Sequence, residues 1–417
     1  MDVVANGAPL TSAIYSNCDG LREDLLDQFF FPQTQQEAMP YYVFKEKEVQ
    51  GICKASEAVY GALVDSLELL FDKYADKIPE YYGAEFINEY PEFVEYAKHT
   101  YKNNHEAIYG RFDVAYDFEN GKVLGFYENN GDTPVMLFES CYMQDWFAQQ
   151  AGSPEQQSNV WLENLQRYIG KVTKYKNNPK IGILSAMGAI EDSLTSEYLY
   201  WALNEHADCY LYDFEDLYYD FTHKHQPFHV GDVDFDFIFA LQPWEEMVVA
   251  SPDIIAEWRE WGDNVQFLEP AWRWFISNKG SLAWIWWLMN HSGETEFIEE
   301  HKEALNYLLP TYLTANGMKD YVTKPLIGRL SNNIQVFKDN EMVYSTEGFY
   351  EDMQVVYQAY CEPQSVEGRG RAIVGVWMAP YGVEDLMMEA STICLREFDM
   401  HVNDIGNERF IPHIVED

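Results

Sequence analysis

Basic residues are scarce in this 417-residue chain, which has 28 Lys plus Arg against 69 Asp plus Glu and a formal net charge of −41. Binding to the phosphate backbone of a nucleic acid needs a basic surface, so the composition argues against a nucleic-acid partner. An acidic surface attracts cations, which would suit an amine or polyamine. The same charge can also serve solubility alone, and the composition leaves both interpretations open.

Closely spaced cysteines and long apolar runs are absent as well. The six cysteines are scattered and show no spacing of the zinc or redox type, so we expect reduced thiols in a cytoplasmic protein. The opening stretch MDVVANGAPL has neither the basic start nor the long apolar run of a signal peptide. The most apolar segment, residues 272–290, contains Arg273 and Lys279 and is too interrupted to span a bilayer. We therefore expect no membrane association and predict a buried helix over this segment.

The common phosphate-binding motifs are missing too. Neither GxxxxGKS nor GxxxxGKT occurs, and no GxGxxG motif opens a strand–helix unit. Any nucleotide site in this chain must therefore use another architecture.

Alternating strand and helix patterns in the middle of the chain favour a parallel α/β sheet. The predicted strands there, all short and apolar, are residues 180–187, 209–215 and 235–243. A helix is predicted between the first two, over residues 191–207. We divide the chain into a mostly helical region (1–108), a lobe with a hairpin and the parallel sheet (109–265), and a mixed region (266–417). No internal repeat or linker is visible, so we expect interleaved lobes.

The stretch RFDVAYDFENGKVLGFYENN, residues 111–130, predicts a β-hairpin. Its two alternating runs flank Asn120-Gly121, the strongest short hairpin pattern. A two-residue turn at that position fixes which residues face each other. The pairs expected on an apolar face are Phe118 with Val123, Tyr116 with Gly125, and Val114 with Tyr127.

The other face of this hairpin would place Asp113 opposite Glu128 and Arg111 opposite Asn130. Directly facing carboxylates repel each other and weaken a strand pair. Asp113, Glu128 and Asn130 offer hard oxygen ligands suited to Mg²⁺, and a divalent cation between them would turn repulsion into attraction. The alternative is a solvent-facing hairpin whose acids are simply hydrated, and the pattern leaves both open.

Four basic residues stand in or beside apolar stretches of this acidic chain. They are Lys279 in SNKG, Lys324 and Arg329 in VTKPLIGR, and Arg396 in STICLREFD. Any single lysine of this kind can extend to solvent or pair with an acid. Together with a magnesium site, however, such a set is what a triphosphate needs, because the metal bridges phosphate oxygens and the cations offset developing charge.

Six motifs resemble those of the glutathionylspermidine synthase family, in the same order. They are YENNGDTPVMLFES with the following QDW, EPAWRWFISNKGSLAWIWW, YVTKPLIGR, VYQAY, LREFD and ERFIPH. The resemblance runs from about residue 100 to the C-terminus and is to the stand-alone acid–amine ligases, because the first hundred residues hold nothing like the amidase domain of bifunctional members. It implies an α/β (α+β) fold of the ATP-grasp-like type, in which residues 266–417 form the nucleotide-binding lobe. The implied activity is ATP- and Mg²⁺-dependent amide formation through an acyl-phosphate.

The resemblance also implies roles for individual residues. The implied magnesium ligands are Asp113, Glu128 and Asn130. The arginines that would stabilise the transferred phosphoryl group and the tetrahedral intermediate are Arg111, Arg329 and Arg396. The residues matched to ATP binding are Lys279, Lys324 and Gln358, and those matched to substrate binding are Thr133, Glu191 and Asp192. The last two also fit a simple acidic first turn of a helix, which its dipole favours.

Two departures from the family pattern concern the substrate and the rate. Val135 replaces a hydroxyl residue and cannot donate a hydrogen bond, and Ser331 replaces a glycine and tolerates fewer backbone conformations. We expect a small or peptide acid and an amine as substrates, with glutathione and spermidine as the default pair. A ligase for a protein or cell-wall peptide terminus, or an ATP-binding protein whose chemistry has decayed, are the alternatives. A homodimer is one assembly left open.

Overall fold

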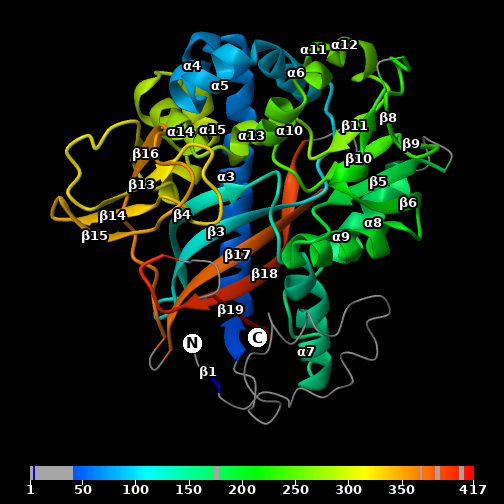
Figure 1. Cartoon of the computed structure of the whole chain (residues 1–417). Coiled ribbons are helices and arrows are strands. Elements are labelled where there is room, and N and C mark those ends of the chain that lie inside the picture. Colours follow the sequence, from blue (N-terminus) through cyan, green and yellow to red (C-terminus); the bar gives the residue numbers. More distant parts are fainter. Residues whose placement is uncertain are drawn as a thin grey trace.

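The computed structural model describes residues 3–4, 41–172, 178–220, 222–366, 369–380, 386–402 and 408–417. Cys18 and most of the first forty residues of the predicted helical region lie outside this part. The five cysteines it describes are free thiols. Figure 1 shows a central sheet with a helical cap above it and a further sheet on either side.

The N-terminal region is mostly helical where it is described, as predicted. Its long helix α3 (Glu46–Asp72) begins where Glu48 accepts a hydrogen bond from the backbone N–H of Lys45, and it buries one apolar face. The shorter helices that follow are α4 (Ile78–Tyr82), α5 (Ala84–Glu89) and α6 (Pro91–Lys102). A strand that the periodicity did not predict, β2 (Tyr41–Lys45), pairs in parallel with the C-terminal β20 (His413–Glu416). On its other edge β2 pairs antiparallel with β1 (Val3–Val4).

The central sheet has five strands in the order β19-β18-β17-β3-β4 and is antiparallel. Its members are β3 (Gly110–Asp117), β4 (Lys122–Asn130), β17 (Arg371–Pro380), β18 (Met388–Phe398) and β19 (Arg409–Ile411). Helix α3 packs on one face of this sheet (Figure 1). The sheet joins strands from the predicted segments 109–265 and 266–417, whose boundaries stay a prediction.

The parallel sheet predicted for the middle of the chain is confirmed, with the strand order β11-β10-β5-β6. Its strands are β5 (Lys180–Ser185), β6 (Asp208–Asp213), β10 (Phe237–Ala240) and β11 (Gln266–Leu268). The helices around it are α8 (Trp161–Val172), α9 (Ile190–Leu203), α10 (Trp244–Ala250), α11 (Pro252–Ala256) and α12 (Trp258–Trp261). A small antiparallel sheet beside it contains β7 (Tyr218–Tyr219), β8 (Phe228–Val230) and β9 (Val233–Asp234).

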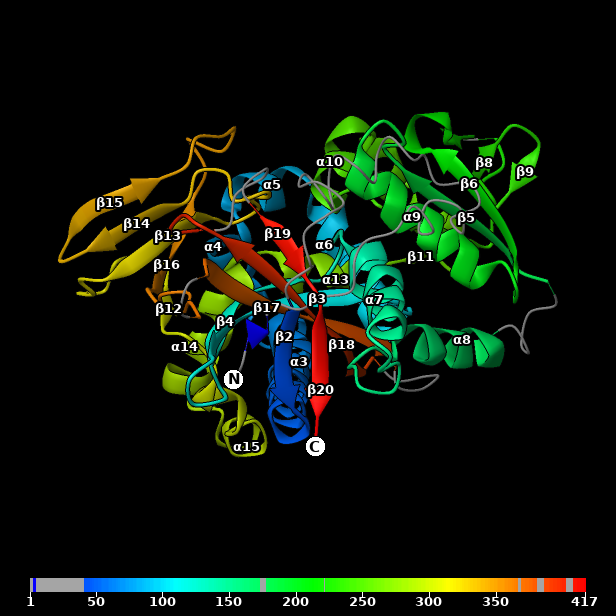
Figure 2. The ribbon, with the colours of Figure 1, turned by 90° about the horizontal axis from the view of Figure 1, so that it is seen from below.

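A third, antiparallel sheet lies on the opposite side of the central sheet (Figure 2). Its order is β12-β16-β13-β14-β15, with β12 (Thr311–Tyr312), β13 (Tyr321–Pro325), β14 (Gln335–Lys338), β15 (Glu341–Ser345) and β16 (Val355–Ala359). Further helical segments are a π-helical turn (Glu139–Met143), α7 (Gln144–Gln150) and α15 (Thr295–Glu300). The third sheet and the parallel sheet therefore face each other across the strands of the hairpin.

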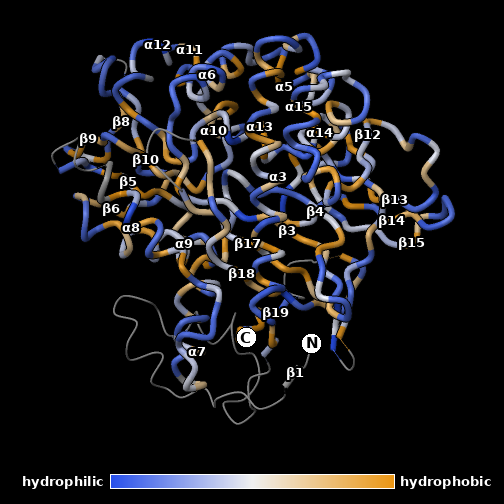
Figure 3. The backbone as a smooth tube through the Cα atoms, turned by 180° about the vertical axis from the view of Figure 1, so that it is seen from behind, coloured by the Kyte–Doolittle hydropathy of each residue, from blue (hydrophilic) through white to orange (hydrophobic). Residues whose placement is uncertain are grey.

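The predicted tryptophan-rich helix is two helices, α13 (Trp272–Ser277) and α14 (Gly280–His291). Helix α13 ends before Asn278, which has a ψ of 131°, and Gly280 then packs so closely that a Cβ would lie 1.8 Å from the carbonyl oxygen of Tyr81. Figure 3 shows that the apolar stretches of the chain gather in the interior strands and helices. Among the described residues, every helix is too short or too polar to cross a membrane.

Candidate functional site

A cavity of about 400 Å³ opens among the three large sheets, and all twelve candidate residues line it. They are Arg111, Asp113, Glu128, Asn130, Thr133, Glu191, Asp192, Lys279, Lys324, Arg329, Gln358 and Arg396. These residues span almost 300 positions of sequence, from the hairpin to β18. The fold thus brings together side chains that lie far apart in the sequence.

The hairpin pairs its cavity-lining residues in the predicted register. β3 and β4 place Asp113 opposite Glu128 and Arg111 opposite Asn130. On its other edge β3 pairs with β17, where Gly375 faces Asp113. A Cβ at Gly375 would lie 3.2 Å from Cδ of Arg111, so the glycine leaves room for the arginine side chain to cross the sheet face.

Nearer the turn the predicted register is wrong. The predicted pairs were Phe118 with Val123, Tyr116 with Gly125, and Val114 with Tyr127. Instead Tyr116 faces Val123 and Val114 faces Phe126. Phe118 lies in the loop of residues 118–121 and is buried.

Asp117 explains the longer loop. Its carboxylate accepts hydrogen bonds from the backbone N–H groups of Glu119 (3.1 Å) and Asn120 (2.9 Å), which favours a wider turn than the two-residue type. Two one-residue bulges in β4, at Leu124 and Tyr127, then move the pairing by two positions. The register at the site is therefore the predicted one although the turn differs.

The two facing carboxylates are neutralised by protein cations in this structure. Oδ1 of Asp113 accepts a hydrogen bond from Nε of Arg111 at 3.0 Å and lies 2.6 Å from a terminal guanidinium nitrogen of Arg396. Oε2 of Glu128 lies 3.2 Å from Nζ of Lys279. The repulsion predicted for a bare carboxylate pair is thus already relieved by the chain itself.

The amide group of Asn130 lies between the two carboxylates. Its Nδ2 is 3.4 Å from Oδ2 of Asp113 and 3.5 Å from Oε1 of Glu128. Because amide oxygen and nitrogen exchange places by a simple flip, the same position can present Oδ1 to a shared ligand. Two carboxylates and one amide oxygen converging on one point fit the oxygen donors that Mg²⁺ prefers.

Lys279 and Lys324, which come from two separate elements, both act on the charge of Glu128. Lys279, at the break between α13 and α14, donates a hydrogen bond to the carbonyl of Gly328 at 2.7 Å, and Lys324, on β13, donates to the carbonyl of Tyr127 at 2.9 Å. Burial alone would raise the pKa of Glu128, but the charges of Lys279 and Lys324 outweigh it and lower that pKa to about 2. Burial and the charge of Lys279 lower the pKa of Lys324 to about 8.

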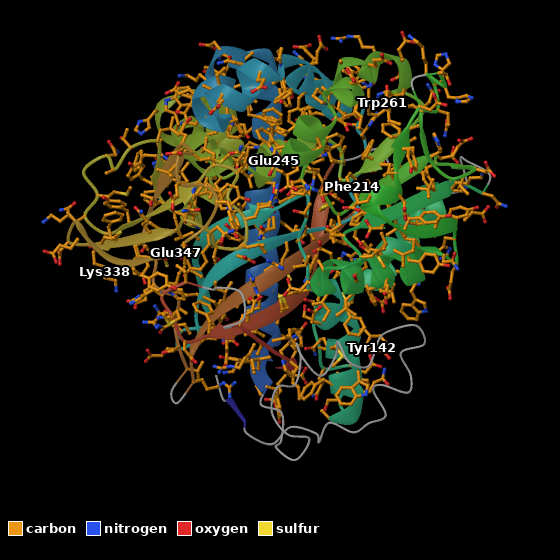
Figure 4. The ribbon with its side chains drawn as sticks, viewed as in Figure 1. Tyr142, Phe214, Glu245, Trp261, Lys338 and Glu347 are labelled. Carbon is orange, nitrogen blue, oxygen red and sulfur yellow. The ribbon has the colours of Figure 1, made fainter. Side chains whose placement is uncertain are left out.

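Arg329 is held by two buried carboxylates. A terminal guanidinium nitrogen lies 2.9 Å from Oδ2 of Asp132 and 2.9 Å from Oε1 of Glu245, and the other donates to Oγ1 of Thr133 at 2.9 Å. Burial would lower the pKa of Arg329, but the two carboxylates raise it. Glu245, labelled near the middle of Figure 4, also accepts a hydrogen bond from the indole N–H of Trp274 at 2.8 Å. In this conformation Arg329 is therefore engaged by protein acids.

Another part of the cavity lining is acidic, although Glu408 within it also lies 3.5 Å from Arg396. Glu191 and Asp192 occupy the first turn of α9, directly after the end of β5, and Glu246 and Glu408 line the cavity with them. Burial and the charge of Glu408 raise the pKa of Glu191 to about 7, against the effect of Arg111. Burial raises the pKa of Asp192 to about 6. This wall can therefore hold a cation in direct contact.

Gln358 lies on β16, between β12 and β13 of the third sheet. Its side-chain N–H donates to the carbonyl of Phe126 at 3.3 Å, which leaves the amide oxygen as an acceptor. The hydroxyl of Tyr127 donates to the carbonyl of Cys361 at 2.9 Å and ties the hairpin bulge to the end of this sheet. The hairpin and β16 thus form one wall of the cavity.

Four acidic residues of the site were missed by sequence reasoning: Asp132, Glu245, Glu246 and Glu408. Asp132 and Glu245 bind Arg329, and Glu408 lies 3.5 Å from Arg396. Glu408 opens the motif ERFIPH, so the resemblance could have found it. Glu245 stands in an unremarkable acidic helix turn, and only the fold brings it to Arg329.

Residues 32–416 match the family model described as glutathionylspermidine synthase preATP-grasp. The chain belongs to this family. A curated relative from Haemophilus influenzae named "Putative acid--amine ligase" is 30% identical over 334 residues, which cover 75% of this chain and 76% of the relative. The glutathionylspermidine synthase family and this relative together support assignment of the chain as a ligase.

The fold has a counterpart among solved structures. A glutathione synthetase-like effector from Globodera pallida, determined in its apo form, superposes with a TM-score of 0.50 at 11% sequence identity. The match covers 91% of each chain. The likeness concerns the fold, which mixes helices with parallel and antiparallel sheets.

Both departures from the pattern of the glutathionylspermidine synthase family lie at the cavity. Val135 contributes its backbone, because its carbonyl accepts a hydrogen bond from Arg111 at 2.7 Å while its side chain packs against a hydrophobic cluster. Ser331 has a φ of 56°, and the preceding Leu330 has a φ of 53°. The serine thus occupies a left-handed conformation that a glycine would adopt without strain.

Proposed function

We propose that this protein is an ATP- and Mg²⁺-dependent ligase that joins a carboxylic acid to an amine through an acyl-phosphate. The observation that carries the proposal is the division of one cavity into a side with paired cations and hard oxygen donors and a side with clustered carboxylates. The first suits a metal-bound triphosphate and the second suits a cationic amine. The ATP-grasp-like fold is part of this proposal.

ATP would lie between the third sheet and the hairpin. Lys279 and Lys324 would neutralise phosphate oxygens, and the free amide oxygen of Gln358 would accept a hydrogen bond from the adenine amino group. Asp113, Glu128 and Asn130 would hold Mg²⁺, which when bound offsets the charge of the β- and γ-phosphates. Because Asp113 and Glu128 are already paired with arginine or lysine, binding would exchange partners and leave no carboxylate unpaired.

Transfer would take place beside Arg111 and Arg396. An oxygen of the acid attacks the γ-phosphorus, the bond to the β-phosphate oxygen breaks, and ADP leaves. The two guanidinium groups, which flank Asp113, would neutralise the charge that spreads over the transferred phosphoryl group. Arg329 could join them only by releasing Glu245 or Asp132.

The amine would bind at Glu191, Asp192 and Glu408. Its neutral form attacks the acyl carbon, the carbon–nitrogen bond forms, and inorganic phosphate leaves. The proton that the ammonium group must lose can pass to a carboxylate of this wall, since the raised pKa values of Glu191 and Asp192 suit a proton acceptor near neutrality. Several acids at one wall favour an amine with more than one positive charge.

A glutathione-like acid and a polyamine form the first substrate pair to test. The occupied Arg329 and the strained Ser331 favour one rival function, an ATP-binding protein without turnover. A ligase for a protein or cell-wall peptide terminus differs only in the acid. Phosphate release from ATP that needs both an acid and an amine would exclude the binding-only rival.

The deciding experiment is mass spectrometry of products formed from ATP, Mg²⁺ and panels of acids and amines. We expect a condensation product in the wild type and its loss in Glu128→Gln and Arg329→Ala. Glu299→Gln is the control, because Glu299 is an exposed residue that pairs with Lys302 on the surface. Wild-type turnover in both site variants would contradict the site assignment.

A further inference from the structure

The turn of the β3–β4 hairpin does not determine the pairing at the site. Between the loop at residues 118–121 and the pair Asp113–Glu128 lie two bulges, and each one moves the pairing by one residue. A further slip would turn Glu128 or Asn130 to the other face of the sheet. The register must therefore be fixed by contacts at the open end of the hairpin, beyond the pair Arg111–Asn130.

The buried ion pair of Arg273 and Glu269 binds the backbone of both strands at this end of the hairpin. Nε of Arg273, at the start of α13, donates to the carbonyl of Gly131 at 2.7 Å, and a terminal nitrogen donates to the carbonyl of Tyr109 at 2.8 Å. Gly131 directly follows Asn130, and Tyr109 lies two residues before Arg111. One guanidinium group thus joins the entry of β3 to the exit of β4.

Glu269, which follows the end of β11, binds the entry of β3 as well as Arg273. Its Oε1 accepts hydrogen bonds from the backbone N–H groups of Ile108 (2.8 Å) and Tyr109 (3.1 Å), and its Oε2 accepts from Nε of Arg273 at 3.0 Å. Arg273 is fully buried and Glu269 is 3% exposed. Every one of these contacts is charge-assisted and shielded from water, the condition under which such bonds are strongest.

Two further features show that the backbone is built around this pair. Glu269 has a φ of 83°, a strained conformation for a residue with a side chain, and strain of this kind persists only where the surroundings enforce it. At Gly110 a Cβ would lie 2.3 Å from a terminal nitrogen of Arg273, so only glycine admits the guanidinium group here. The remaining terminal nitrogen of Arg273 donates to the hydroxyl of Tyr60 on α3 at 2.8 Å.

We propose that Arg273 and Glu269 are positioning residues that fix the register of the hairpin base and so hold Asp113, Glu128 and Asn130 in mutual reach. They touch neither the nucleotide nor the acid and amine in the proposed reaction, and they act on the site through the backbone of residues 108–110 and 131. The inference rests on the proposed function where it concerns the metal. The fixing of the register can be tested without it.

Arg273→Lys tests the proposal, with Tyr60→Phe as its matched control. Lysine keeps the charge beside Glu269 but cannot reach Gly131, Tyr109 and Glu269 together, whereas Tyr60→Phe removes the contact of Arg273 that does not go to the hairpin or to Glu269. Mn²⁺ binding to the full-length protein in the presence of ATP is measured by electron paramagnetic resonance. Hydrogen–deuterium exchange of peptides covering residues 108–113 and 128–131 is followed in parallel.

We expect Arg273→Lys to weaken Mn²⁺ binding on the order of 10–100-fold, as loss of a residue that orients metal ligands does elsewhere. Exchange should quicken at both hairpin peptides. Tyr60→Phe should change Mn²⁺ affinity less than about twofold, even if both variants lose similar thermal stability. Equal Mn²⁺ affinity in Arg273→Lys and Tyr60→Phe, with equal exchange at the hairpin base, would overturn the proposal.

The two proposals fail in different ways. If the wild type binds no Mn²⁺, the metal site of the proposed function is wrong. Hydrogen–deuterium exchange at residues 108–113 and 128–131 then tests by itself whether Arg273 and Glu269 fix the register. If Arg273→Lys does not fold, as judged by circular dichroism, Glu269→Gln replaces it, because the amide keeps an acceptor for Ile108 and Tyr109 but loses the charge. Failure of both to fold would also count against the proposal, since it would mean that the pair supports the whole fold and not the hairpin.

Discussion

The two sides of the cavity handle charge in opposite ways. On the side of the hairpin, Asp113, Glu128 and Asp132 each lie within 3.3 Å of a lysine or arginine nitrogen. On the side of α9, Glu191 and Asp192 form no ion pair with any residue in the described ranges, and their pKa values are raised to about 7 and about 6 by burial, with Glu408 adding to the shift at Glu191.

This difference indicates what each side is prepared to receive. On the hairpin side every carboxylate is already paired with a cation, so a ligand that brings both a metal cation and phosphate anions can exchange partners there without leaving a charge unpaired. The α9 side holds negative charge that burial makes unfavourable, and a cation would relieve it. Variants that change one side at a time test this contrast.

The largest effect is expected from Glu128→Gln, which removes a charge from the hairpin side. Loss of a metal-type carboxylate should lower kcat by about 100-fold or more, because charge stabilisation at the phosphates fails. Steady-state kinetics with saturating acid and amine measure the effect, and Glu299→Gln on the surface should behave as wild type. A change in the KM for the amine alone would contradict the assignment of Glu128 to the hairpin side.

Lys279→Met should raise the KM for ATP by about 10–100-fold, the range expected for one charged hydrogen bond. The KM for the amine should stay within about twofold. Isothermal titration with a non-hydrolysable ATP analogue checks the binding step directly. Equal losses for ATP and amine would mean that the two sides do not act separately.

Glu191→Gln should do the reverse and raise the KM for the amine by about 10-fold while the KM for ATP stays unchanged. The physical reason is loss of one of the charges that attract the ammonium group. Asp192→Asn provides the matched neighbour variant and should act in the same direction. An unchanged amine KM in both would remove the α9 side from substrate binding.

The α9 side should also respond to pH. Below about pH 6 both Glu191 and Asp192 are largely protonated and neutral, so the KM for a cationic amine should fall several-fold as the pH rises from 5.5 to 8. The wild type is compared with Glu191→Gln combined with Asp192→Asn, whose amine KM should be nearly flat over the same range. An equally steep profile in the double variant would assign the dependence to other groups.

The smallest effect is expected from Ser331→Gly, which borders the hairpin side. Glycine relieves a left-handed strain of about 1–2 kcal/mol but costs about 0.5–1 kcal/mol of chain entropy, so a gain of about 0.5–1 kcal/mol is expected. Chemical denaturation measures it. Ser331→Ala keeps the strain and should bring no gain, and a stabilisation of equal size there would point to a different cause.

The sequence allowed the pairing at the site to be predicted, although by a mechanism that the structure corrects. Asn120-Gly121 indicated a hairpin correctly, but the hydrogen bonds of Asp117 widened the turn and two bulges compensated. The elements of the parallel sheet were predictable because short apolar strands and an intervening helix have distinct periodicities. The break between α13 and α14 was not, and neither was the close approach of Gly280 to the distant backbone of Tyr81.

The residues that line the cavity were predictable from ordered motifs, whereas their partners were not. Asp132 and Glu245 meet Arg329 from separate parts of the chain, and nothing in their local sequence marks that meeting. The hydrogen bonds of Arg273 to the backbone at the hairpin base could not be predicted for the same reason. Its motif EPAWRWF suggested a buried helix, and only the fold shows what the arginine holds.

The central sheet also constrains how the protein can be made. Strand β3, which carries Arg111 and Asp113, has β17 as its neighbour, and β17 in turn pairs with β18, which ends at Phe398 and carries Arg396. During synthesis the hairpin of β3 and β4 emerges more than two hundred residues before β17 and β18, with which it forms the sheet. A nascent chain that ends before β18 therefore cannot display the assembled cavity.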